Sequence, residues 1–167
     1  PTAITAFGVG GTGRIHQFDE FYRTGAIGVE EIGAWLMERH AKAPFFGIYC
    51  DPSQPVAIES LRAGGLPAVA ADNRREGIGM VAGLLKQGRL TVAEACVNTR
   101  REFVTYKVRD RMDPNSRERY ETSTPVDHHG DAMDANRYAL VAIMQIEESA
   151  GLAIGTTSGR PRRLFAV

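Results

Sequence analysis

Three aspartates have the residue type and the spacing to do chemistry. Asp51 directly follows the apolar run Phe45–Cys50 and stands just before a helical segment. In open α/β sheets, sites assemble at the carboxyl ends of strands, where a side chain is exposed and rigidly based. Asp131 and Asp134 are three residues apart, so on a helix their carboxylates share one face. A cation beside them would remove the repulsion between these like charges.

Each acidic group also has a purely structural explanation. Asp51 has the residue type and the position of an N-cap of the helix that follows, with Pro52 or Pro55 at an early helical position. Asp131 and Asp134 fit an acidic first turn, which the helix dipole favours. Spacing alone leaves both explanations open. If the carboxylates do bind a metal, the oxygen ligands favour Mg²⁺ or Mn²⁺ over zinc, because no Cys/His framework accompanies them.

Other chemistries lack their motifs. The chain has neither a nucleophile elbow nor a P-loop lysine motif. The segment Gly8–Gly13 matches a dinucleotide-binding glycine pattern, but the residues after it alternate like a strand, which predicts a hairpin turn. Cys50 and Cys96 are predicted to be buried free thiols in a reducing compartment. No apolar run approaches the roughly 18 residues of a membrane span, so no membrane partner is expected.

The elements that must position the aspartates follow from hydrophobic periodicity. We expect an antiparallel hairpin, then alternating helices and parallel strands, then a long last helix, which is a mixed α/β domain. The predicted strands are residues 4–9, 14–22, 45–50, 67–71 and 90–92, and the predicted helices are residues 29–42, 56–63, 77–87, 98–109 and 127–149.

Two segments have no predicted regular structure. Residues 109–125 are polar, with two prolines, and are expected to form a long loop. Around this loop, residues 100–119 carry seven basic and four acidic side chains, which fits either a phosphate-binding surface or a solvated charged face. The domain is expected to span residues 1–150, followed by a mobile C-terminal tail over residues 151–167.

The two acidic segments together resemble the nuclease domain of phage terminase large subunits, the motor proteins of DNA packaging. Ile48–Leu61 is similar to that family's second acidic motif, a strand ending in Asp, a short turn with proline and an Ile-Glu-x-Leu helix. Met133–Ala139 is similar to its third, an acid followed by Ala-x-Arg-Tyr-Ala. The Gly77–Leu90 segment, and Glu102 with Tyr106, also fit. The resemblance covers about residues 1–145.

The resemblance implies an RNase H-like fold and metal-dependent cutting of concatemeric double-stranded DNA. Asp51, Asp134 and Asp131 would be the catalytic metal ligands of a site for two Mg²⁺ or Mn²⁺ ions roughly 4 Å apart. The expected contacts to DNA phosphates come from the predicted loop, and the candidate auxiliary residues lie elsewhere. The phosphate contacts are Arg109, Arg111, Arg117 and Arg119, and the auxiliary residues are Glu20, His128 and His129, although histidines at a helix start are more often solvated.

The family's first acidic residue lies on a strand just before the segment that matches Pro1–Ile4, so we expect that strand and a preceding ATPase domain upstream. The implied partners are that ATPase domain, the small terminase subunit and the portal, and the implied place is the procapsid portal in the cytoplasm of an infected bacterial host. Two alternatives stay open. One is another RNase H-like nuclease, of the resolvase or transposase type, and the other is a non-catalytic module that docks to the portal or the ATPase.

Overall fold

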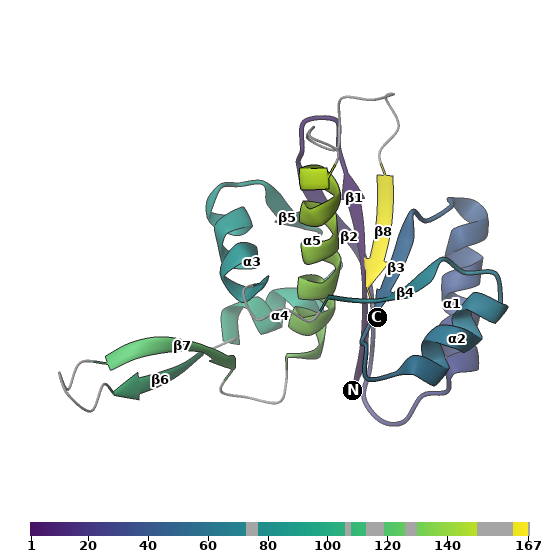
Figure 1. Cartoon of the computed structure of the whole chain (residues 1–167), viewed down its shortest axis with the longest axis horizontal. Coiled ribbons are helices and arrows are strands. Elements are labelled where there is room, and N and C mark those ends of the chain that lie inside the picture. Colours follow the sequence, from purple (N-terminus) through teal and green to yellow (C-terminus); the bar gives the residue numbers. More distant parts are fainter. Residues whose placement is uncertain (73–76, 106–107, 113–118, 126–129, 150–161, 167) are drawn as a thin grey trace.

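The fold is a mixed sheet with helices on both sides (Figure 1). The computed structural model describes residues 1–72, 77–105 and 130–149 in full, and the backbone alone of residues 108–112, 119–125 and 162–166. The helices are α1 (Val29–Lys42), α2 (Pro55–Ala63), α3 (Gly77–Lys86), α4 (Val97–Thr105) and α5 (Asp131–Ser149). The strands are β1 (Thr2–Val9), β2 (Ile15–Arg23), β3 (Gly47–Cys50), β4 (Ala68–Ala70), β5 (Leu90–Val92), β6 (Val108–Met112), β7 (Arg119–Pro125) and β8 (Arg162–Ala166).

The main sheet has the strand order β4-β3-β8-β1-β2-β5. β1 pairs antiparallel with β2, whereas β2 with β5 and β3 with β4 pair in parallel. This confirms the predicted antiparallel hairpin with a parallel continuation. β3 and β4 are joined through α2, as a parallel pair requires a crossover.

β1 is buried on both of its faces, because side chains alternate across a strand. Phe7 and Val9 pack with α3 and α5, while Ile4 and Ala6 pack with α1, α2 and β3. Each of these four side chains is at most 1% exposed. The helices therefore cover both faces of the sheet, with α5 lying across β1 and β3 on one of them (Figure 1).

The glycine-rich segment is a hairpin turn, as predicted. The Gly10 N–H donates to the Arg14 carbonyl oxygen at 2.8 Å, and the Gly13 N–H donates to the Gly10 carbonyl oxygen at 3.0 Å. Gly13 has φ +72°, a conformation that glycine adopts without steric cost. β2 follows the turn directly, so there is no helix N-terminus here to hold a dinucleotide.

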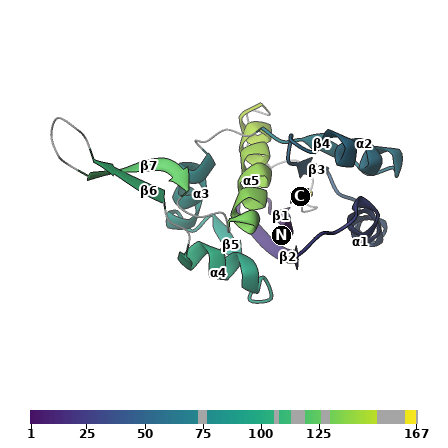
Figure 2. The same cartoon turned by 90° about the horizontal axis from the view of Figure 1, so that it is seen from below.

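The region around residues 108–125 differs from the prediction. The expected helix over residues 98–109 ends at Thr105, and the expected loop contains β6 and β7. Within the described strands these two pair antiparallel with each other and with no third strand. This hairpin extends away from the main sheet (Figure 2). Hydrophobic periodicity missed it because two strands satisfy each other's backbone groups without an alternating apolar face.

The end of the chain also differs from the prediction. The last long helix starts at Asp131, four residues after its predicted start, since Gly130 is not helical. Part of the expected mobile tail forms β8, which lies between β1, to which it is antiparallel, and β3, to which it is parallel. Its partners Thr5–Val9 and Gly47–Tyr49 leave room for one strand between them. Tertiary pairing, which no local pattern reports, places this segment inside the sheet.

Within the described residues, none of the helices combines the length and the apolar character needed to cross a membrane.

Candidate metal centre

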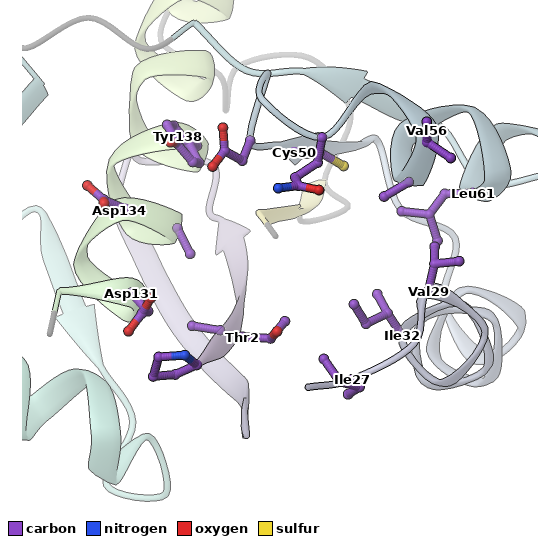
Figure 3. Close-up of a pocket in the computed structure, with 16 residues that line it drawn as sticks. Thr2, Ile27, Val29, Ile32, Cys50, Val56, Leu61, Asp131, Asp134 and Tyr138 are labelled. Carbon is purple, nitrogen blue, oxygen red and sulfur yellow. The ribbon is translucent and has the colours of Figure 1, made fainter. Parts of the chain in front are cut away.

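One pocket, of about 520 Å³, brings the three aspartates together. Asp51 reaches it from the end of β3, and Asp131 and Asp134 reach it from the first turn of α5. Figure 3 shows the α5 side chains on one wall and those of Cys50, α1 and α2 facing them across the space. The remaining wall comes from the start of β1, at Pro1 and Thr2. The two acidic segments are eighty residues apart in sequence, and the fold makes them neighbours.

Asp51 is held by the turn that leads into α2. Its Oδ1 accepts a hydrogen bond from the Ser53 N–H at 2.8 Å, and its carbonyl oxygen accepts one from the Gln54 N–H at 3.0 Å. The N-cap of α2 is Gln54, which makes no side-chain cap, and Pro55 begins the helix. Asp51 therefore rigidifies the turn and does not cap the helix itself. A carboxylate bonded through one oxygen in this way retains acceptor capacity on the other.

Asp131 has a buried oxygen that needs a partner. Its Oδ2 makes no hydrogen bond within the part of the chain that the structure describes. A buried carboxylate oxygen without a donor is costly, and a cation or an ordered water would remove that cost. The donor set and the orphaned oxygen thus fit a hard divalent cation.

Asp134 is oriented by an arginine of its own helix. Its Oδ1 accepts a hydrogen bond from Arg137 Nη2 at 3.0 Å, and the Asp134 side chain is 53% exposed whereas that of Arg137 is 10% exposed. Arg137 fits because α3 starts with a glycine. A Cβ added at Gly77 would lie 2.5 Å from Arg137 Cγ and 2.9 Å from its Cδ. Gly77 therefore leaves the space through which Arg137 reaches Asp134.

Tyr138 is a residue of the pocket to which the sequence assigned no role. Burial, with smaller contributions from the charges of Asp51 and Asp134, raises the pKa of the Tyr138 hydroxyl. The influence of both carboxylates on one hydroxyl agrees with their convergence on the same pocket. Tyr138 lies four residues after Asp134, on the same face of α5, and this spacing was the available signal.

Glu20, an expected auxiliary residue, lies elsewhere. Its Oε1 accepts hydrogen bonds from the backbone and side-chain nitrogens of Asn98, and its Oε2 accepts them from the backbone N–H and hydroxyl of Thr99, all at 2.8–2.9 Å. Glu20 therefore caps the first turn of α4 and does not line the pocket. The structure gives it a role in stability.

Three of the four expected DNA contacts belong to β6 and β7. Arg109 and Arg111 are in β6 and Arg119 is in β7, with Arg111 paired to Tyr120 and Met112 paired to Arg119. The structure describes only the backbone there. Arg117, His128 and His129 lie outside the described residues.

A complete metal cluster is not present among the described residues. No group of three or more His, Cys, Asp or Glu side chains there is arranged to hold one ion. The three aspartate side chains line the same pocket, but they do not converge on one position where all three could bind a single ion.

The solved structures that this chain matches include large terminases of bacteriophages. The chain matches a large terminase from a thermophilic bacteriophage, in its crystal form 2, with a TM-score of 0.68, 28% identity and coverage of 84% of this chain and 36% of that one. It matches the same terminase in complex with ATP-gamma-S with a TM-score of 0.63, 27% identity and coverage of 81% and 36%. The chain thus spans just over a third of the length of these relatives.

A third match is to an isolated domain. The g2p (large terminase) nuclease domain of bacteriophage SPP1, solved with bound Mn, superposes with a TM-score of 0.60 and 16% identity over 85% of this chain and 86% of that one. No protein-family model matches the sequence, and no curated protein matches it. The fold is that of a large terminase nuclease domain, which confirms the predicted fold class and the resemblance to large terminases.

Proposed function

We propose that this chain is the metal-dependent endonuclease domain of a viral terminase large subunit, which cuts concatemeric double-stranded DNA during genome packaging. The observation that carries the proposal is the pocket shared by Asp51, Asp131 and Asp134. Its support is the fold shared with the thermophilic phage terminase and with the SPP1 nuclease domain solved with bound Mn. The whole protein would act at the portal in the host cytoplasm, with its ATPase domain and the small terminase subunit.

The three aspartates would hold Mg²⁺ or Mn²⁺. Bound there, the metal supplies an activated water and stabilises negative charge on the phosphate. Arg137 holds Asp134 in one orientation, and the Ser53 N–H holds Asp51. These contacts preorganise the carboxylates, so that less conformational freedom is lost when an ion binds.

DNA would be gripped by its phosphates without base readout. Arg109, Arg111, Arg117 and Arg119 are the proposed contacts, on and around the β6–β7 hairpin. The proposal is supported by the basic residues of β6 and β7, which form a hairpin separate from the main sheet. Because each phosphate contact releases condensed counterions, this binding should weaken steeply with salt.

Plasmid cleavage and metal binding test the proposal together. Asp134→Asn and Asp51→Asn are expected to abolish Mn²⁺-dependent cleavage and to weaken Mn²⁺ binding measured by calorimetry. Glu59→Gln is the matched control, because its carboxylate is 76% exposed on α2 and does not line the pocket. Cleavage by Asp134→Asn at the wild-type rate would show that the pocket takes no part in the reaction.

Cleavage assays on linear and branched DNA distinguish a terminase nuclease from the two alternatives, a resolvase-type nuclease and a docking module. Cleavage of linear duplex at least as fast as of branched DNA supports a terminase nuclease, and a strong preference for branched junctions would indicate a resolvase. Portal binding without metal, combined with no cleavage by a chain that includes the upstream strand, would indicate a docking module.

A further inference from the structure

The first turn of α5 has no side-chain cap from the residue that precedes it. That residue is Gly130, which has no side chain, and its carbonyl oxygen accepts the Asp134 N–H at 2.8 Å. The first N–H groups of a helix have no partner within the helix and need an acceptor from elsewhere. Ala132 is 1% exposed and Met133 is 7% exposed, so water does not readily supply it.

Glu102, on α4, supplies that acceptor across the core. Its Oε2 accepts the Met133 N–H at 3.0 Å, and its Oε1 makes no hydrogen bond within the described residues. Glu102 itself is only 3% exposed. A carboxylate at a helix N-terminus is stabilised by the helix dipole as well as by this hydrogen bond. The start of α5 is thus fixed by a residue from another helix.

Tyr22, on β2, completes the link. Burial, together with the neighbouring Glu102 carboxylate, raises the pKa of Tyr22 to about 12. Burial, and to a smaller extent the charge of Asp131, raises the pKa of Glu102 above its usual value. Glu102 therefore contacts the sheet on one side and the aspartate-bearing turn on the other.

We propose that Glu102 is a positioning residue of the metal centre, which fixes the first turn of α5 and thereby the carboxylates of Asp131 and Asp134. It does not line the pocket, so it acts through the helix that it caps. This inference rests on the proposed function, because it assigns a role in the same site. Supporting groups of this kind commonly change metal affinity by one to two orders of magnitude.

The test compares two isosteric variants of the full chain. Glu102→Gln removes the charge and one acceptor at the start of α5. Glu147→Gln is the control near the other end of α5, where the carboxylate is 9% exposed and accepts two hydrogen bonds from Arg89 at 3.0–3.1 Å. Both changes should lower the melting temperature. Only Glu102→Gln should weaken Mn²⁺ binding, by about tenfold, at a temperature where all proteins are folded.

Amide hydrogen exchange without metal provides the second measurement. Glu102→Gln should speed exchange at Ala132 and Met133, and Glu147→Gln should not. Equal Mn²⁺ affinity in Glu102→Gln and wild type, or equal loss in the two variants, would overturn the inference. If wild type binds no Mn²⁺, the proposed function fails, and the role of Glu102 in a metal centre fails with it. If wild type binds Mn²⁺ but exchange in Glu102→Gln is unchanged, the proposed function stands and the positioning role is refuted.

Discussion

Two glycines of α3 give the sharpest test of how Asp134 is held. A Cβ at Gly77 would lie 2.5 Å from Arg137 Cγ and 3.1 Å from Val141 Cγ2, whereas a Cβ at Gly79 would meet nothing within 4 Å. Both residues belong to the same helix. Alanine gains about 0.5–1 kcal/mol over glycine inside a helix, and overpacking a buried site costs about 1–3 kcal/mol.

These magnitudes predict opposite signs. Gly79→Ala should stabilise the protein by about 0.5–1 kcal/mol, and Gly77→Ala should destabilise it by about 1–2 kcal/mol, because the clash exceeds the helical gain. The two variants should then differ by about 2 kcal/mol. For a chain of this size each kcal/mol shifts the melting temperature by about 2–4 °C, so the melting temperatures should lie about 4–8 °C apart.

Thermal unfolding followed by circular dichroism measures the difference, and a double-mutant cycle assigns its cause. Arg137→Ala removes the Cγ and Cδ atoms that the new methyl group would meet, so the penalty of Gly77→Ala should largely disappear in that background. Equal stability of Gly77→Ala and Gly79→Ala would refute the reasoning. A penalty that persists undiminished without the arginine side chain would show that the clash has another source.

Three further predictions follow from the fold and its buried groups. Glu20→Ala should lower the free energy of unfolding by about 1–2 kcal/mol and leave Mn²⁺ affinity unchanged, because it uncaps α4; a loss of metal binding would contradict this. Burial raises the pKa of Cys50 to about 12 and that of Cys96 to about 11, so the folded protein should not react with thiol reagents at about pH 8. Unfolded thiols ionise near about pH 8.5, so the stability that these thiols contribute should fall as the pH rises from there toward the folded pKa values, and a flat profile would count against their burial. Deleting residues 162–167 should leave β3 and β4 unpaired with β1, and a deletion variant with wild-type stability and Mn²⁺ binding would show that β8 is dispensable.

β8 also bears on how Asp51 is positioned. In the described sheet, β3 joins β1 only through β8. The register pairs Tyr49 with Ala166, so the end of β8 lies close to the strand end that presents Asp51. The deletion experiment therefore tests the assembly of the pocket as well as the stability of the sheet.

Local sequence patterns were sufficient to predict most of the helices and strands and to select the candidate ligands. Alternation in the first 23 residues, the apolar run before Asp51 and the helical periodicity of residues 131–149 each reflect contacts that recur at a fixed spacing along one element. The same patterns placed Asp51 at a strand end and Asp131 with Asp134 on one helix face. They also excluded a dinucleotide site, since a strand follows Gly13.

Only the tertiary structure showed which segments these elements contact. The pocket shared by the aspartates, the capping of α5 by Glu102, the role of Glu20 at α4 and the place of β8 all depend on contacts between segments that lie far apart in the sequence. Periodicity shows which side of an element is apolar, but a long-range partner changes no residue spacing within either segment. The physical reason is that local propensity is a property of one segment, whereas pairing, burial and charge depend on which segments pack together.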